Sequence, residues 1–158
     1  MVWQAGEEIT LRLFRPSDLA QITELERKVY GSGAYSYYFF RQLHDLFPRL
    51  VWVAERGELL VGHVCGAINQ TGQTGWILNL AVQAHSRGRG VGSRLVAQVI
   101  EELRASGVHE IRTTLHPENE PGIRTFERNG FVRERIEENY YGDGVDRLIL
   151  RLSVKEAD

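Results

Sequence analysis

The sequence lacks the features of secreted and membrane proteins. It has a single cysteine, Cys65, so no internal disulfide can form, and the apolar residues around this position favour a reduced, buried thiol. No apolar run reaches the length of about 18 residues that a membrane helix needs, and the first residues lack the basic and then apolar pattern of a secretory leader. We therefore expect a cytoplasmic protein with no membrane partner.

The sequence also lacks an excess of basic residues and the spacing of a metal site. The formal net charge is −2, whereas a general nucleic-acid-binding domain is usually basic. One cysteine and five scattered histidines give no cluster of ligands, so we expect neither nucleic acid nor metal as a partner. With 158 residues, 42% of them hydrophobic and 25% charged, the chain is typical of one globular domain over residues 1–158.

Apolar residues recur at two spacings that predict an alternation of strands and helices. Alternate positions are apolar in strands, and positions three or four apart are apolar in helices. The second helical segment carries several aromatic residues, so part of it could be a loop. Strands are predicted at residues 9–14, 50–55, 59–68, 76–82, 109–115, 131–140 and 145–154, and helices at residues 19–29, 35–46, 91–103 and 120–128.

The most informative stretch is residues 87–93, with the sequence Arg-Gly-Arg-Gly-Val-Gly-Ser. It joins a predicted strand to the most regular predicted helix. Glycines let the backbone approach an anion closely, and the amides that open a helix have no helical carbonyl to bind. The helix dipole and the arginines favour negative charge at the same place. The stretch therefore predicts a phosphate-binding turn, and the alternative is a tight connection with a solvated basic face.

Two common phosphate-binding motifs do not fit this stretch. A dinucleotide fingerprint needs the first strand of a βαβ unit and an acidic residue about 20 positions later, whereas these glycines follow a run of three predicted strands. A nucleoside-triphosphate loop needs a lysine before its serine or threonine, and Gly92 stands in that place before Ser93. A different phosphorylated cofactor is therefore expected.

The pattern Arg87-x-x-Gly90-x-Gly92, followed by Asn119 and by Asn-Gly-Phe at residues 129–131, resembles the GCN5-related N-acetyltransferase superfamily. The resemblance covers nearly the whole chain, since the predicted element order is also similar. Within that superfamily, the sequence looks most like the branch that acetylates ribosomal proteins and protein N-termini, on the basis of residues 78–82 and 139–146.

The resemblance implies an α/β fold, the acyl-CoA N-acyltransferase fold. This is a mixed, mostly antiparallel sheet of about seven strands with about four flanking helices, splayed in the middle to admit a pantetheine arm. It also implies transfer of an acetyl group from acetyl-CoA to a primary amine by direct attack in a ternary complex. The favoured acceptor is a protein or peptide N-terminal amine. The alternatives are a small amine (polyamine, amino acid or aminoglycoside) or a coenzyme A-binding module with little transferase activity, and a homodimer is common among such proteins.

The same resemblance implies the cofactor contacts. Backbone amides of the turn would hold the pyrophosphate, and the splayed strand would pair with the pantetheine arm. An amide of that strand would polarise the acetyl carbonyl, where a fixed donor stabilises the developing oxyanion. The implied contacts are Leu80, Ala81, Val82, Arg87, Gly88, Arg89, Gly90, Val91, Gly92, Ser93, Asn119 and Phe126.

The acid and the base of the resembled branch are missing. A glutamate on the fifth strand and a tyrosine on the following helix would occupy the positions of Thr114 and Phe126, and neither residue exchanges a proton near neutral pH. Attack on a thioester needs a neutral amine, so another proton acceptor or a water path is required. The candidate catalytic residues are Glu26, His116, Tyr140 and Tyr141.

Each candidate also has a purely structural interpretation. Glu26 lies in a stretch of mixed charge that favours a solvated helix face, and His116 precedes a proline at a strand exit, where exposed loop residues are common. Tyr140 and Tyr141 alternate in a predicted strand, so one would pack in the core and the other would face the cleft or solvent. The aromatic run at residues 35–40 would wall the acceptor site or simply pack together.

Overall fold

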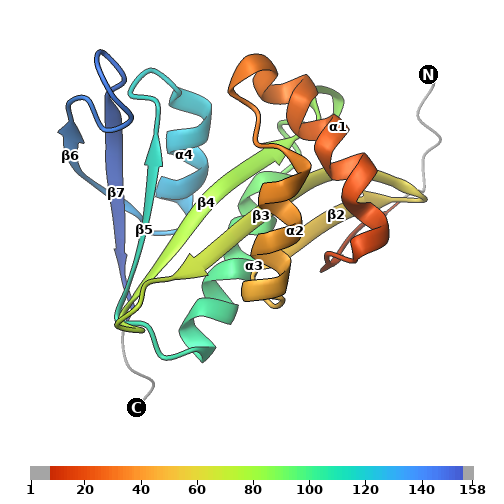
Figure 1. The fold of residues 1–158 in the computed structure, drawn as a ribbon, viewed down its shortest axis with the longest axis horizontal. Helices are drawn as coiled ribbons and strands as arrows, with labels where there is room; N and C mark the ends of the chain where they lie inside the picture. The colour runs from red at the N-terminus through yellow and green to blue at the C-terminus, as the bar shows by residue number, and fades with distance from the viewer. Residues whose placement is uncertain (1–7, 155–158) are drawn as a thin grey trace.

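In a computed structural model of the chain, the structure describes residues 8–154 (Figure 1). One seven-stranded sheet has the strand order β1-β2-β3-β4-β5-β7-β6. The strands are β1 (Ile9–Leu13), β2 (Val51–Arg56), β3 (Leu59–Ile68), β4 (Thr74–Val82), β5 (Glu110–Leu115), β6 (Val132–Glu137) and β7 (Arg147–Ser153). The helices are α1 (Leu19–Tyr30), α2 (Tyr37–Leu46), α3 (Val91–Ala105) and α4 (Glu120–Arg128), with three short 3-10 turns between elements.

The strand pairing confirms the predicted mixed, mostly antiparallel sheet. Every neighbouring pair is antiparallel except β4 and β5, which run parallel. The predicted element order is also confirmed. α2 buries Phe40 and Leu43 but leaves Tyr37 and Leu46 exposed, whereas the apolar positions of α3 are buried. In α3, for example, Val91, Leu95 and Val99 face the sheet and have almost no exposed surface.

Strand β6 is shorter than the sequence predicted. β6 ends at Glu137, and Tyr140 and Tyr141 lie in the loop that leads to β7. Asn139 has a φ of 56°, and its Oδ1 accepts a hydrogen bond from the amide of Gly144 at 2.8 Å, so the chain turns before the two tyrosines. The expectation that these rings alternate across a strand is therefore wrong, and both side chains are exposed.

Strands β4 and β5 separate after a short stretch of pairing. Residues 74–77 of β4 pair with residues 110–113 of β5. Beyond Ile77 the two strands diverge, as Figure 1 shows, and residues 78–82 pair only with β3. On their other side these residues have no strand partner, so backbone groups there can meet side chains or a ligand. The predicted splay in the middle of the sheet is confirmed.

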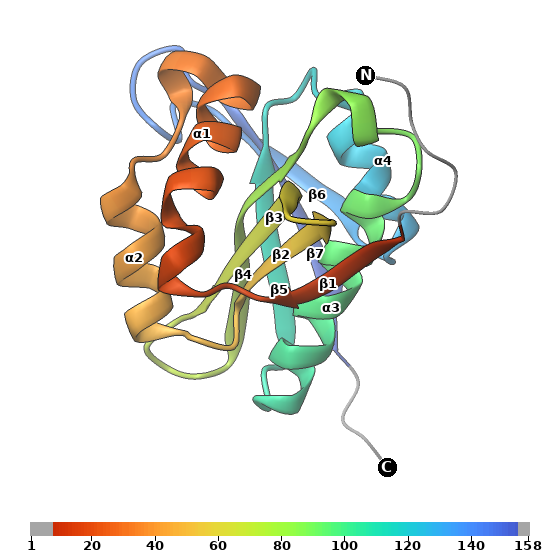
Figure 2. The same ribbon diagram turned by 90° about the vertical axis from the view of Figure 1, so that its right-hand side faces the viewer.

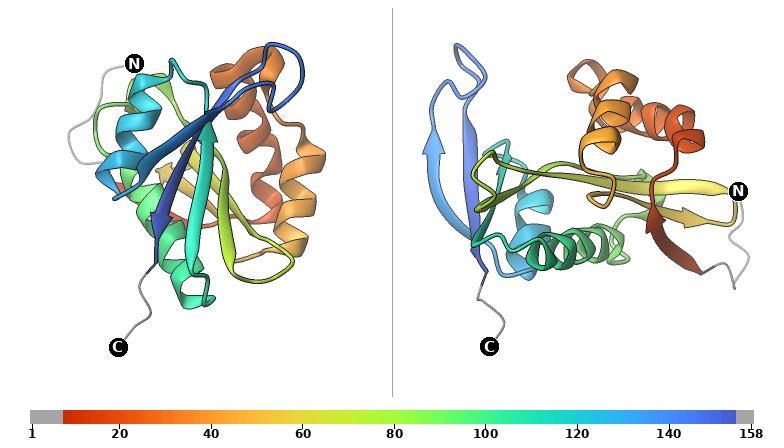
Figure 3. Two further views of the ribbon diagram at one scale, coloured as in Figure 1. Left: turned by 90° about the vertical axis from the view of Figure 1, so that its left-hand side faces the viewer. Right: turned by 60° about the horizontal axis from the view of Figure 1, so that its bottom comes forward.

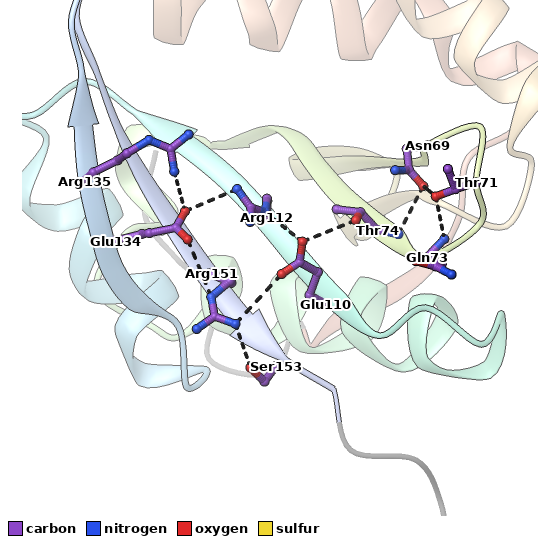
Figure 4. A network of polar contacts seen from close by, with 10 residues as sticks. All are labelled: Asn69, Thr71, Gln73, Thr74, Glu110, Arg112, Glu134, Arg135, Arg151 and Ser153. Carbon is purple, nitrogen blue, oxygen red and sulfur yellow. Dashed lines mark hydrogen bonds and ion pairs between the residues drawn. The ribbon is translucent and has the colours of Figure 1, made fainter.

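The helices cover the two faces of the sheet unequally (Figures 2 and 3). α1 packs on β3 and β4 and α2 packs on β3, whereas α3 packs on β2, β3 and β4 from the other side, with α4 beside it. One apolar cluster around Leu95 fills the α3 and α4 side, and another around Phe40 lies beneath α1 and α2. Over β5, β7 and β6, the face opposite α4 carries charged side chains instead of a helix (Figures 3 and 4). We call this surface the open face.

The lone cysteine is a core residue. Cys65 lies on β3 with no exposed surface, and burial, followed by the negative charge of Glu26, raises the pKa of its thiol well above the ordinary value. The predicted buried thiol is confirmed, and such a thiol is a poor nucleophile. Among residues 8–154, no helix has the length and apolar content needed to cross a membrane, and no three potential metal-binding side chains gather in one place.

Candidate active site

Two cavities adjoin where β4 and β5 separate. The first, which we call the turn cavity, has a volume of about 560 Å³ and lies beside the glycine turn at the start of α3. The second, which we call the α1 cavity, has a volume of about 470 Å³ and lies between α1, β4, β5 and the start of β7. The residues that border both cavities are Tyr30, Leu80, Asn119 and Gly122. The splayed strand therefore joins the two cavities.

The turn cavity brings together most of the residues that the sequence singled out for a cofactor. Arg89 belongs to the same turn but does not line the cavity, and Phe126 is buried and borders the α1 cavity instead. From α4 the cavity also receives Arg124, Thr125 and Arg128, which the sequence did not indicate. The predicted residues that do line it are Leu80, Ala81, Val82, Arg87, Gly88, Gly90, Val91, Gly92, Ser93 and Asn119.

The turn has glycine where its backbone requires it. Gly88 and Gly90 have φ angles of 75° and 78°, a region that favours glycine. The first helical hydrogen bond of α3 runs from the amide of Arg94 to the carbonyl of Gly90 at 3.0 Å, so the amides of Gly92 and Ser93 have no helical acceptor. Together with the positive end of the helix dipole, these amides favour an anion in the turn cavity.

Side chains fix the turn on both sides. Nε of Arg87 donates to the carbonyl of Val82 at 3.1 Å, which holds this guanidinium over the end of β4. Nδ2 of Asn129 donates to Oγ of Ser93 at 3.1 Å, which ties the end of α4 to the start of α3. The turn is therefore attached to the splayed strand and to the neighbouring helix.

The turn cavity fits the pyrophosphate of coenzyme A. Ser86 is fully buried at its wall, and the Ser86 hydroxyl has no hydrogen-bond partner among the described residues. A Cβ at Gly92 would stand 3.5 Å from side-chain atoms of Thr125 and Val82, so any longer side chain there would fill the space between α3, α4 and β4. The amides of the turn and the Arg87 guanidinium suit phosphate oxygens.

Glu26 is buried in the α1 cavity and does not lie on a solvated helix face. Its side chain has no exposed surface, because the helix turns this position inward together with Ile22 and Leu25. Oε1 accepts hydrogen bonds from Nδ2 of Asn79 at 2.9 Å and from the amide of Tyr35 at 3.4 Å. Oε2 has no hydrogen-bond partner within residues 8–154. The expectation of a solvated position is therefore wrong.

Two neighbours of Glu26 escaped the sequence analysis. His63 of β3 is fully buried, and its Nε2 lies 3.0 Å from Oε2 of Glu26, an ion-pair distance when the ring is protonated. The ring packs edge-on against Phe40, with centroids 5.2 Å apart. His63 and Asn79 hold the carboxylate in one orientation. Both interrupt strands that are otherwise mostly apolar, which is the signal that could have found them.

The other three candidate residues are placed less favourably for accepting a proton. His116 is exposed at the end of β5 and borders the α1 cavity. Its Nδ1 accepts a hydrogen bond from the amide of Glu118 at 3.1 Å, so the neutral ring carries its proton on Nε2 and has no open acceptor. Tyr141 borders the same cavity. Tyr140 does not border it, and its ring packs edge-on against the ring of Tyr141. Among the candidates, Glu26 is the one carboxylate that lines the α1 cavity.

Two further polar side chains of the α1 cavity come from distant parts of the chain. The hydroxyl of Tyr30, at the end of α1, donates to the carbonyl of Leu80 on the splayed strand. Loss of solvent raises the pKa of this hydroxyl to about 12, so it stays protonated at neutral pH. Arg147 of β7 donates to Thr114, the position where the resemblance predicts a glutamate. No local spacing links Tyr30 to Arg147, and only the fold brings them together.

Comparisons with known proteins agree with this geometry. The family model of the Acetyltransferase (GNAT) family matches residues 19–131. Human N-alpha-acetyltransferase 30 is 29% identical over 154 residues, which are 94% of this chain but 42% of that protein, so the chain spans about two fifths of its relative. L-2,4-diaminobutyric acid acetyltransferase of Nocardia farcinica is 30% identical over 129 residues, or 78% of this chain and 66% of that protein. The crystal structure of Ard1 from Thermoplasma volcanium superposes with a TM-score of 0.84 and 25% identity, covering 94% of this chain and 99% of that chain.

Proposed function

The chain belongs to the Acetyltransferase (GNAT) family, and on this premise we propose that it transfers an acetyl group from acetyl-CoA to the N-terminal amine of a protein or peptide. The observation that carries the proposal is the buried carboxylate of Glu26, which lines the α1 cavity, beside the turn cavity, and whose Oε2 makes no hydrogen bond among the described residues. Nε2 of His63 lies 3.0 Å from that oxygen. A buried carboxylate needs polar or cationic partners, and an acceptor amine would be a second one.

The turn cavity would hold the cofactor. When bound, acetyl-CoA supplies an activated acetyl group as a thioester and is released as the free thiol. The amides of Gly92 and Ser93 and the guanidinium of Arg87 would bind the pyrophosphate. The unpaired edge of residues 78–82 would bind the pantetheine arm, and an amide of Leu80 or Ala81 would donate to the acetyl carbonyl.

Glu26 would remove the proton that blocks the acceptor nitrogen. Amines are mostly protonated near pH 7, and the nitrogen needs its lone pair to bond to the acetyl carbon while the carbon–sulfur bond breaks. Oε2 of Glu26 accepts this proton, and Asn79 and His63 hold the carboxylate toward the cavity. The attack is direct, because Cys65, whose thiol is buried with a raised pKa, does not suit an acyl carrier.

A peptide acceptor is favoured over a small amine by two features. The human relative is named for acetylation at the α-amine, and the loop beside the α1 cavity exposes Tyr141, whose ring could contact residues beyond the first. The relative from Nocardia farcinica is named for acetylation of a diamino acid, so a small amine is the second candidate. A coenzyme A-binding module is disfavoured because Glu26 supplies the proton acceptor that Thr114 cannot.

The decisive experiment identifies the acetylated product. The full chain is incubated with acetyl-CoA and a library of peptides with free N-termini, and in parallel with small amines, while thiol release is followed and products are sequenced by mass spectrometry. We expect acetylation on the terminal nitrogen, and none on matched peptides whose N-terminus is blocked. Thiol release no faster than hydrolysis with every acceptor would instead support the binding module.

A matched pair of glycine variants tests the cofactor half of the proposal. Gly90→Glu places a negative side chain at the start of α3, where φ is 78°, so it opposes the pyrophosphate by charge. Gly72→Glu imposes the same substitution at a φ of 74° in the turn before β4, away from the cavity. We expect calorimetry to show coenzyme A binding lost in the first variant and kept in the second. Unchanged affinity in folded Gly90→Glu would contradict the assignment.

The cellular setting and the assembly state are part of the same proposal. A cytoplasmic setting is supported by the unpaired, buried thiol of Cys65, because disulfide-free proteins are typical of reducing compartments. The expected partners are the amine substrate and a second copy of the chain. Sedimentation equilibrium over a range of concentrations would test the homodimer.

A further inference from the structure

Arg147 is held in the α1 cavity by contacts that leave part of its guanidinium open. Nε donates to Oγ1 of Thr114 at 3.1 Å, and Nη2 donates to the Thr114 carbonyl at 2.8 Å. Cζ lies 5.3 Å from the centre of the Tyr141 ring, a distance typical of a cation–π contact. Within residues 8–154, Nη1 makes no hydrogen bond. The planar group is therefore fixed with one nitrogen left for a ligand.

Other arginines on the same sheet face show what Arg147 lacks. Arg112 and Arg151 contact Glu110 and Glu134 at distances from 2.9 to 3.9 Å (Figure 4). No carboxylate in the described part of the chain lies within ion-pair distance of Arg147, which is half-buried. A charge that is withdrawn from water needs a partner of opposite sign. An anionic ligand would supply it.

Glu26 contributes the opposite charge to the same cavity. It reaches the cavity from α1, whereas Arg147 reaches it from β7. Both charges act on the hydroxyl of Tyr30: its pKa is about 12 because desolvation and then Glu26 raise it, while Arg147 lowers it. A cavity of about 470 Å³ thus holds a negative and a positive group that are not paired with each other. Such a site suits an acceptor that carries both signs of charge.

We propose that Arg147 binds a carboxylate of the acceptor, so that the protein prefers acceptors with a carboxylate close to the reacting amine. The inference rests on the proposed function, in which Glu26 takes the amine. A guanidinium and a carboxylate form a charge-assisted hydrogen bond, which is strongest where water is scarce. The carboxylate belongs to an acidic first side chain of a peptide or to the α-carboxylate of a small amino acid, and the experiment separates these two sources.

The test compares two peptides that differ in one charge. Both have amidated C-termini and the same sequence after the first residue, which is glutamate in one and glutamine in the other. For the wild-type protein we expect kcat/KM to be about tenfold higher with the glutamate peptide, through KM, because one charge-assisted bond is gained. Raising the salt concentration should reduce this preference, since charges near solvent are screened.

Three variants assign the preference to Arg147. Arg147→Gln should abolish it, because the glutamate peptide should lose more kcat/KM than the glutamine peptide. Arg147→Glu should reverse it toward a peptide that begins with lysine. Arg151→Gln is the matched control, because Arg151 lies on the same strand and face but outside the cavity, and it should keep the wild-type preference. Titration of each peptide into the complex with coenzyme A should show the same order of affinities.

The outcomes separate this inference from the proposed function. Equal kcat/KM for both peptides, together with equal rates for a free diamino acid and its α-amide, overturns the role of Arg147 and leaves the function standing. An equal loss for both peptides in Arg147→Gln also overturns it, because the arginine would then serve only to hold Tyr141. If no acceptor is acetylated, the function and the inference both fail. A free diamino acid favoured over its α-amide identifies the α-carboxylate as the source, whereas a preference for the glutamate peptide identifies the side chain.

Discussion

The charged residues of the open face and those of the α1 cavity differ in how completely they are paired. On the open face, the contacts between carboxylates and guanidiniums form a continuous network (Figure 4). Glu134 lies 3.2 Å from Arg112, 2.8 Å from Arg135 and 3.8 Å from Arg151. Between 24% and 48% of the surface of each of these side chains is exposed to solvent. Each of these side chains has an oppositely charged neighbour and remains in contact with water, although Nε of Arg151 makes no hydrogen bond with another described residue.

The α1 cavity shows the opposite arrangement. Glu26 has no exposed surface, and its Oε2 makes no hydrogen bond within residues 8–154 although Nε2 of His63 lies 3.0 Å away. Arg147 has a fixed guanidinium without a carboxylate partner among the described residues. Exposed pairs contribute little to stability, whereas buried charges cost free energy unless a partner is present. The difference indicates that the open face serves the scaffold and that the cavity charges serve a ligand.

The largest expected effect comes from the buried carboxylate. Glu26→Gln keeps the shape of the side chain and an oxygen for the Asn79 hydrogen bond, but it removes the proton acceptor. We expect kcat to fall by about a hundredfold or more, the range for loss of a general base. Steady-state thiol release with a saturating acceptor measures this fall.

Two controls show whether the fall reflects chemistry. Coenzyme A affinity should be unchanged in Glu26→Gln, because the pyrophosphate contacts lie in the other cavity. The midpoint of thermal unfolding should show that the variant remains folded at the assay temperature. A kcat close to the wild-type value in this variant would mean that Glu26 is not the proton acceptor. The charges of the α1 cavity would then not differ in role from those of the open face.

The sequence predicted the cofactor half of the site better than the acceptor half. The phosphate-binding turn is one continuous stretch, residues 87–93, whose backbone chemistry can be inferred from glycine positions alone. The acceptor half depends on which residues of α1, β3 and β7 the fold brings together. Glu26 was named but placed on the wrong face, because charged neighbours obscured the inward position, and Arg147 was not indicated by any local pattern. The turn at Asn139 places the two tyrosines in a loop. Side-chain hydrogen bonds determine the conformation of this turn, and the alternation of apolar and polar residues does not predict them.

A smaller effect is expected at the junction of the two cavities. Tyr30→Phe removes the hydrogen bond to the Leu80 carbonyl, so the splayed strand loses one of its anchors. One neutral hydrogen bond contributes about 1 kcal/mol, so kcat/KM should fall about fivefold. Because the pKa of this hydroxyl is about 12, its ionisation should leave no inflection in the wild-type rate near neutral pH.

Tyr38→Phe provides the matched control for this prediction. Tyr38 lies on α2, is exposed and borders neither cavity, so loss of its hydroxyl should leave kcat/KM unchanged. Equal rates for Tyr30→Phe and the wild type would mean that the strand holds its position without the tyrosine. The junction would then be a passive wall of the cavity.

The smallest effect is expected on the open face. Glu134→Gln removes the carboxylate that three arginines share, yet each of these side chains is partly exposed and screened by solvent. The free energy of unfolding, measured by urea titration, should therefore change by less than about 1 kcal/mol, and the change should shrink as salt is added. Acetylation should be unaffected, because no residue of the network borders either cavity. A loss of activity like that of Glu26→Gln would show that the open face affects the active site. The extent of ion pairing would then no longer distinguish charged residues that stabilise the fold from charged residues that bind a ligand.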